Sequence, residues 1–108
     1  MTEHENAGSL PRFTDIATET LRYVEIVVLH EPRHDGTDVV WTLSLTDRVG
    51  RPLGRQTVTV PAAYDYLPHL AAELRLHLVG LTVHGHWYRS RDGRAVRHYA
   101  RVTSVSQS

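Results

Sequence analysis

The sequence feature that most constrains the fold is a predicted β-hairpin near the end of the chain. The pair Asp92-Gly93 lies between two stretches of alternating apolar and polar residues. An Asp-Gly pair in that setting is typical of a two-residue type I′ turn. We therefore predict antiparallel strands over residues 81–88 and 95–105, with Asp92 and Gly93 at the centre of the turn.

This register sorts the side chains of the hairpin between two faces, because directly opposed residues of a sheet point to the same side. One face is mostly apolar and should lie on the core; it pairs Leu81 with Ser104, Val83 with Val102, Gly85 with Ala100 and Trp87 with His98. The other face is aromatic and cationic and should meet solvent; it pairs Thr82 with Thr103, His84 with Arg101, His86 with Tyr99 and Tyr88 with Arg97. A slip of one residue would exchange the two faces.

Three further strands and one helix are predicted upstream of the hairpin. The first strand covers the β-branched stretch 23–29, and the second covers residues 39–46, where apolar and polar side chains alternate. The third strand covers residues 56–60 and ends at a proline. Between residues 65 and 78 the apolar spacing becomes helical, with one apolar stripe formed by Leu67, Leu70, Ala71, Leu74 and Leu78.

The resulting order is three strands, a helix and two strands. This order, β-β-β-α-β-β, predicts an all-β fold: a five-stranded OB-fold, a β-barrel with one helix. A chain of 108 residues has room for one such domain, which we assign to residues 21–108. Residues 1–20 are polar and acidic and lack periodicity, so we predict a flexible acidic N-terminal segment.

The charge of the chain is unevenly distributed, although its formal net charge is zero. Residues 1–20 hold four acidic residues and one arginine, which leaves eleven arginines against eight acidic residues in the remainder. All twelve basic residues are arginine, a side chain suited to phosphate forks and to stacking on bases. A GC-rich genome would produce the same bias, and both explanations can hold together.

Arginine and aromatic residues gather in the predicted loops and on the last hairpin, and OB-folds bind ligands in a groove that such loops frame. Surfaces of this kind bind single-stranded nucleic acid, because bases stack on aromatic rings while cations follow the phosphates. The candidate nucleic-acid-binding residues are Arg33, Arg48, Arg51, Arg55, Tyr64, Trp87, Tyr88, Arg89, Arg91, Arg94, Arg97, Tyr99 and Arg101. Trp87 also falls on the predicted core face, so a place in the core is its competing interpretation.

Several short segments follow one another in a familiar order between residues 22 and 105. They are Glu31-Pro32-Arg33, the strand over residues 39–46, Val58-Thr59-Val60, a helix ending at Leu78-Val79-Gly80, then Leu81-Thr82-Val83-His84-Gly85, Trp87-Tyr88-Arg89, Asp92-Gly93 and the final alternating strand. Together they resemble bacterial single-stranded-DNA-binding proteins (SSB). The resemblance implies an OB-fold that binds single-stranded DNA with little sequence preference, as a homodimer or homotetramer, in DNA replication and repair.

Two departures from the family pattern bear on function. The second loop, residues 47–55, has no aromatic residue, whereas family members stack bases there; Tyr64 and Tyr66 stand near the predicted helix start instead. The sequence also reaches Ser108 directly after the last predicted strand, without the acidic tail of the family. We therefore expect a bare OB domain that does not recruit partners through such a tail.

The sequence predicts no catalysis, no cofactor and no metal. It has no cysteine, which excludes thiol chemistry and disulfides, and it has neither a nucleophile-elbow serine nor a glycine-rich phosphate loop. His84 and His86 share a predicted face, but a zinc site needs further ligands that are not predicted beside them. We predict a protein that is not an enzyme, and a cytoplasmic one, because neither a signal peptide nor a membrane span is evident.

Two functions remain in competition. The first is binding of single-stranded DNA, or RNA, in a groove of arginine and tyrosine formed by the last hairpin and the loops. The alternative is an OB-fold protein–protein interaction or adaptor module that has lost DNA binding, which the neutral net charge and the bare second loop favour. Steep weakening of DNA affinity by salt would favour the first.

Overall fold

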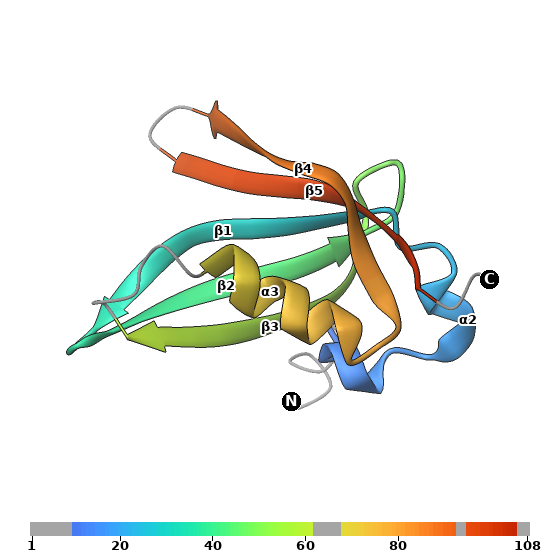
Figure 1. Cartoon of the computed structure of the whole chain (residues 1–108), viewed down its shortest axis with the longest axis horizontal. Helices are drawn as coiled ribbons and strands as arrows, with labels where there is room; N and C mark the ends of the chain where they lie inside the picture. The colour runs from blue at the N-terminus through green and yellow to red at the C-terminus, as the bar shows by residue number, and fades with distance from the viewer. Residues whose placement is uncertain (1–9, 62–67, 93–94, 106–108) are drawn as a thin grey trace, which may run out of the picture.

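A computed structural model describes residues 10–61, 68–92 and 95–105 of the chain (Figure 1). Two short helical segments precede a sheet, and a longer helix lies between its third and fourth strands along the chain. The elements are η1 (Phe13–Asp15), α2 (Thr18–Leu21), β1 (Ile26–Asp35), β2 (Asp38–Thr46), β3 (Pro52–Pro61), α3 (Pro68–His77), β4 (Leu81–Asp92) and β5 (Ala95–Ser104). The predicted order of strands and helix is confirmed.

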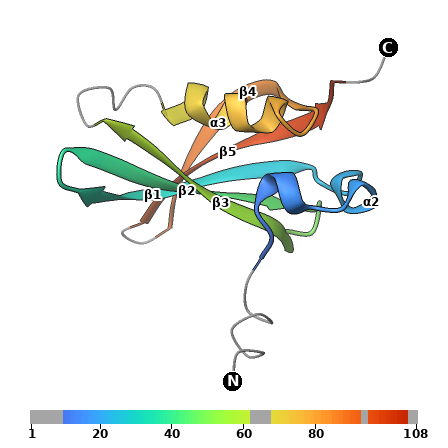
Figure 2. The ribbon, with the colours of Figure 1, turned by 90° about the horizontal axis from the view of Figure 1, so that it is seen from below.

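The five strands form one antiparallel sheet in the order β3-β2-β1-β5-β4. Within the described ranges β3 and β4 are the edge strands, so the sheet is open. Seen along its edge in Figure 2, the sheet is strongly twisted and carries α3 on one side. The predicted all-β class and the single helix beside the sheet are therefore confirmed. The sheet itself is open and twisted.

The core lies on one side of the sheet, which we call the inner face. Alternate side chains of the central strands point into it and are buried almost completely: Val27, Leu29, Leu43, Leu45 and Ala100. The apolar set predicted for residues 39–46 is buried on this face as expected, but Val40, Ser44 and Thr46 of the alternate set are buried as well, so the strand is covered on both sides. The intervening positions of each strand point to the opposite side, which we call the outer face.

Helix α3 covers the inner face between the two edge strands. It contacts both β3 and β4, and it does so with Ala72 and Leu76, which are fully buried. Of the apolar stripe predicted from the sequence, Leu70, Leu74 and Leu78 are exposed and do not face the core, whereas Ala71 is half-buried and packs against it; Leu67 lies outside the described residues. Among the described residues no helix is long and apolar enough to cross a membrane.

The part of the predicted flexible N-terminal segment that is described, residues 10–20, is docked on the sheet. Phe13 and Ile16 are buried in the core, and the Phe13 amide donates to Gln56 Oε1 at 3.1 Å. A side chain at Gly54 would collide with Ile16, so this glycine allows the segment to approach β3. The folded unit therefore begins upstream of residue 21.

The register of the β4–β5 hairpin is confirmed at its base and is different at its tip. From Leu81–Ser104 to His84–Arg101 the strands pair as predicted, but a bulge follows, and beyond it Tyr88 pairs with Tyr99 rather than with Arg97. The last pair is Asp92–Ala95, so the turn lies one residue further along than Asp92-Gly93. Residues 93 and 94 are outside the described part of the chain.

Gly85 gives the physical reason for this difference. Its φ of +89° belongs to a left-handed backbone that glycine adopts without a steric cost, and such residues are common at β-bulges. The bulge places extra residues on β4 opposite β5, which shifts every later pair. Because the shift is by two residues, the faces are preserved: Tyr88 and His84 remain on the outer face, as predicted.

Candidate nucleic-acid interface

The outer face can be mapped from the pairing of the strands, because directly paired residues share one side of a sheet. Three rows cross all five strands. From β3 to β4 they are Arg55–Ser44–Val28–Tyr99–Tyr88, Thr57–Thr42–His30–Arg97–Ser90, and Pro52–Thr46–Ile26–Arg101–His84. None of the residues in these rows is acidic. Although the whole chain has a net charge of zero, these three rows therefore carry only positive charged groups.

The first row ends on a stacked pair of tyrosines. The rings of Tyr88 and Tyr99 lie with their centroids 5.5 Å apart and their planes 28° from parallel. Both side chains are solvent-accessible, with exposed fractions of 51% and 38%. An aromatic surface of this kind offers a nucleobase a flat ring on which to stack, whatever the base.

A hollow lies beside the tyrosines at the centre of the outer face. It has a volume of about 190 Å³ and is lined by β1, β2, β3 and β5, through residues that include His30, Ser44, Arg55 and Arg97. Arg55 and Arg97 enter from its two sides, and both arginines are exposed. The hollow therefore combines apolar lining residues such as Val28 and Pro52 with two arginines, and arginine side chains are suited to bind an anion such as a phosphate.

His30 forms the floor of this hollow. Its Nε2 lies 3.0 Å from Ser44 Oγ, and the side chain is half-buried. Burial lowers the pKa of His30 below its ordinary value, and the charges of Arg97 and Arg55 lower it further. His30 is therefore neutral at pH 7 and becomes easier to protonate when a negative group enters the hollow.

His30 was not among the residues chosen from the sequence. The predicted first strand ended at residue 29, whereas β1 continues to Asp35. Had the alternation in β1 been followed two residues past Val28, it would have placed His30 on the face opposite Leu29. The signal was therefore present in the sequence, directly after the apolar run of residues 26–29.

Five of the predicted residues come together on the outer face with this histidine. Arg97 lies between His30 and Ser90, and Arg101 lies between Ile26 and His84. Tyr88, Tyr99, Arg97 and Arg101 are therefore grouped on the two strands of the last hairpin, and Arg55 joins them from β3 across the hollow. This group is the candidate interface.

Arg89 and Arg91 lie on the other side of the hairpin from Tyr88. They pair with His98 and Val96, and strand alternation turns them away from the outer face. Both side chains are exposed. They belong to the same hairpin as the tyrosines but cannot share one flat surface with them.

Trp87 occupies the inner side of the hairpin. Its ring stacks on His69 of α3, with centroids 4.6 Å apart and an interplanar angle of 4°, and its Nε1 donates to Glu73 Oε2 at 2.9 Å. His69 Nε2 in turn lies 3.1 Å from His98 Nδ1. We call His69, Glu73, Trp87 and His98 the inner cluster. The place of Trp87 in it supports the core interpretation of this residue.

The inner cluster has electrostatic properties of its own. Burial lowers the pKa of His69, while the charge of Glu73 acts in the opposite direction. Burial also lowers the pKa of His98, and the nearby His69 and Arg89 add to that effect. Both histidines are thus neutral at pH 7, which allows them to share one hydrogen bond beneath α3.

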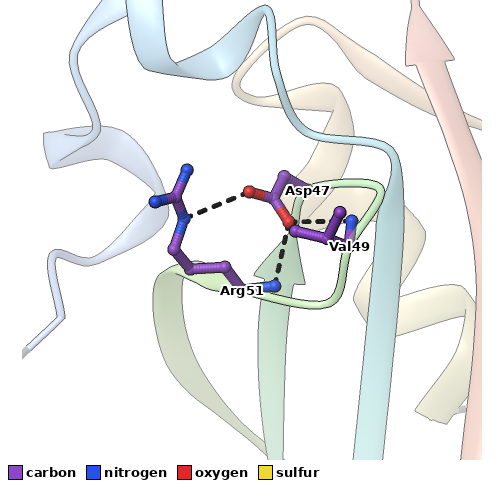
Figure 3. A network of polar contacts seen from close by, with 3 residues as sticks. All are labelled: Asp47, Val49 and Arg51. Atoms are coloured by element: carbon purple, nitrogen blue, oxygen red, sulfur yellow. Dashed lines mark hydrogen bonds and ion pairs between the residues drawn. The ribbon is translucent and has the colours of Figure 1, made fainter.

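The β2–β3 loop is fixed by Asp47 (Figure 3). Its Oδ1 accepts hydrogen bonds from the amides of Val49 at 3.1 Å and Arg51 at 2.9 Å, and its Oδ2 accepts one from Arg51 Nε at 3.2 Å. The Arg51 amide is the largest cause of the lowered pKa of Asp47. The charge of Arg51 is therefore partly neutralised within the loop, whereas Arg48 is exposed beside it.

The remaining predicted residues lie away from the tyrosines or outside the described residues. Arg33 pairs with Val40, which pairs in turn with Thr59, beyond an irregularity in the β1–β2 register; it is exposed and lies on the outer face at the end remote from Arg101. Tyr64 and Arg94 fall on residues that are not described. Within the described ranges, no three histidine, aspartate or glutamate side chains are placed to hold a metal ion together.

Comparison of the chain with protein-family models, with curated proteins and with solved structures finds no match. The function must therefore be argued from the geometry of the outer face itself.

Proposed function

We propose that this protein binds single-stranded nucleic acid, DNA in the first instance, across the outer face of its sheet and with little sequence preference. The observation that carries the proposal is the combination of a stacked, exposed tyrosine pair with Arg55, Arg97 and Arg101 in three rows of the outer face that hold no acidic residue. Stacking on a tyrosine does not depend on the identity of the base, and guanidinium groups bind phosphate.

The geometry favours a single strand over a duplex. The tyrosine rings lie on a sheet face, where unpaired bases can reach them, whereas the bases of a duplex are already stacked on one another. The hollow between Arg55 and Arg97 begins next to Tyr99 in the pairing of the strands. One bound strand can therefore place a base on the tyrosines and a neighbouring phosphate over His30.

The OB-fold assignment is part of this proposal. An OB-fold is a five-stranded, partly open barrel with a groove across its strands. Three observations support it: the order of strands and helix, the strong twist of the open sheet, and the contacts of α3 with both edge strands. On this basis we also propose the cytoplasmic role in DNA replication or repair that the resemblance to SSB implies.

The test is fluorescence anisotropy of a labelled oligothymidine at low salt. The double variant Tyr88→Ala/Arg97→Ala should bind at least about tenfold more weakly than the wild type, since it loses one stacking ring and one phosphate contact. The matched control Tyr23→Ala/Arg12→Ala removes an exposed tyrosine and an exposed arginine from outside the outer face, and it should bind like the wild type. Affinity should also fall steeply as salt rises.

Absence of binding by the wild type at micromolar protein would refute the proposal. The second candidate, a protein-interaction module, would then be preferred. The observation in its favour is the β2–β3 loop, which has no aromatic residue and ties Arg51 to Asp47. Affinity that does not change with salt would also contradict the phosphate contacts on which the first proposal depends.

A further inference from the structure

The tip of the β4–β5 hairpin is a two-stranded ribbon that extends beyond the rest of the sheet. β1 pairs with β5 only as far as His30–Arg97, whereas β4 and β5 stay paired as far as Asp92–Ala95. Figure 1 shows this end of the hairpin diverging from β1. The ribbon therefore has two sides, of which only the outer side belongs to the candidate interface.

Arginines stand on both sides of this ribbon. Arg97 belongs to the outer side with the tyrosines, and Arg89 and Arg91 belong to the opposite side. All three side chains are exposed, and within the described ranges none of them forms an ion pair. The sequences of β4 and β5 hold four arginines and one acidic residue, Asp92. A strand that lies on the tyrosines uses only one side of this positive ribbon.

The side with Arg89 and Arg91 is suited to a different form of nucleic acid from the outer side. Among the described residues it offers no free aromatic ring, because Trp87 is stacked on His69 and the ring of His98 lies 3.1 Å from the same histidine. A ligand on this side can therefore be held through its phosphates but not by stacking. That favours a duplex, whose bases are already stacked on one another, over a second single strand.

The shape of the tip fits the same partner. The major groove of B-DNA is about 12 Å wide and admits a two-stranded β-ribbon between its two phosphate backbones. Arg89 and Arg91 lie two residues apart on β4 and point to the same side. A ribbon in the groove therefore turns both guanidinium groups toward one backbone, while the outer side of the hairpin remains available to an unpaired strand.

We propose that the preferred ligand of this protein is a junction between single-stranded and double-stranded DNA. The unpaired strand lies on Tyr88 and Tyr99, and the tip of the hairpin enters the major groove of the adjoining duplex, where Arg89 and Arg91 bind phosphates. This inference rests on the proposed function and narrows it, because an oligothymidine tail on a duplex becomes a better ligand than the same oligothymidine alone.

The test compares three kinds of labelled ligand by fluorescence anisotropy. They are an oligothymidine, a duplex that carries the same oligothymidine as a tail of either polarity, and the blunt duplex. The wild type should bind a tailed duplex about tenfold more tightly than the oligothymidine, and the blunt duplex most weakly. Two added phosphate contacts should also steepen the slope of log affinity against log salt by about two.

The variant Arg89→Gln/Arg91→Gln should abolish both the preference for the tailed duplex and the added salt dependence. Its affinity for the oligothymidine should stay within about twofold of the wild type, because neither arginine lies on the outer face. The matched control Arg12→Gln/Arg75→Gln removes two exposed arginines from outside the hairpin and should keep the preference. Thermal unfolding of both variants should be nearly unaltered, since all four side chains are exposed.

The outcomes separate this proposal from the proposed function. A wild type that binds the oligothymidine and both tailed duplexes equally overturns the junction and leaves single-strand binding intact. A preference that survives in Arg89→Gln/Arg91→Gln, or a blunt duplex that binds as tightly as the tailed ones, also overturns it. Failure to bind any of the ligands overturns the proposed function and the junction together.

Discussion

The two sides of the β4–β5 hairpin use similar residues for different purposes. On the inner side, Trp87 stacks on His69, and its indole N–H donates a hydrogen bond to Glu73. On the outer side, Tyr88 stacks on Tyr99, and both rings are exposed. One stacked pair is therefore already covered by a helix, whereas the other still offers a ring surface to a ligand. The residue types alone do not distinguish a structural contact from a binding surface. The distinction depends on whether the stacked rings are covered by another element or exposed to solvent.

The largest expected effect separates the two sides by stability. Trp87→Ala should lower the free energy of unfolding by about 2–3 kcal/mol, because it removes a half-buried ring and leaves the stack on His69 empty. Tyr88→Ala should cost less than about 1 kcal/mol, as is usual at an exposed position. Urea denaturation followed by circular dichroism measures both values, and equal losses would show that the two stacks have the same role.

The next effect separates the two sides by affinity. Tyr99→Ala should weaken oligothymidine binding by about 5-fold to 150-fold, the range expected when one stacking ring is lost. Trp87→Phe keeps a ring on the inner side and should leave the affinity within about twofold of the wild type. Fluorescence anisotropy gives both dissociation constants. A larger loss in Trp87→Phe than in Tyr99→Ala would reverse the assignment of the two sides.

A smaller effect concerns pH and the hollow on the outer face. The pKa of His30 is lowered in the free protein, and a bound phosphate would raise it again, so the complex holds more protons than its free components. By linkage, affinity should then rise as the pH falls from 7 toward 5.5, by about twofold to fivefold. His30→Gln should remove most of this dependence. An identical pH profile in the variant would show that no phosphate lies over this histidine.

The smallest effect concerns pH and the inner cluster. The pKa values of His69 and His98 are lowered by folding, so below about pH 6.5 the unfolded chain binds more protons than the folded one. Their contribution to stability is therefore present above that pH and is lost as the pH falls. The double variant His69→Gln/His98→Gln should show a flatter dependence of the melting temperature on pH between 7 and 5.

The sequence predicted most of what depends on local alternation. The strand over residues 39–46, the burial of Val102 and Ala100, and the exposure of Tyr88 and Tyr99 all follow from a period of two. The tip of the hairpin could not be predicted in this way. Its register depends on the bulge at Gly85, and a bulge changes the pairing without changing which residues alternate.

The rotation of α3 was also beyond the sequence pattern. Three leucines at helical spacing would normally indicate the buried side of a helix. Here the buried side is marked by Ala72 and Leu76, and it is fixed by contacts of His69 and Glu73 with residues of the last hairpin. Such contacts join residues far apart in sequence, so periodicity alone does not reveal them.

The docking of the N-terminal segment on β3 has a consequence for how the protein forms during synthesis. The Phe13 amide bonds to Gln56 and the Pro11 carbonyl accepts from the Arg55 amide, and both partners lie more than forty residues later in the chain. The segment therefore leaves the ribosome before β3 does, and it has nothing to bind until β3 has been made. It docks only after β3 is available, and Phe13 stays exposed until the strand that it covers exists.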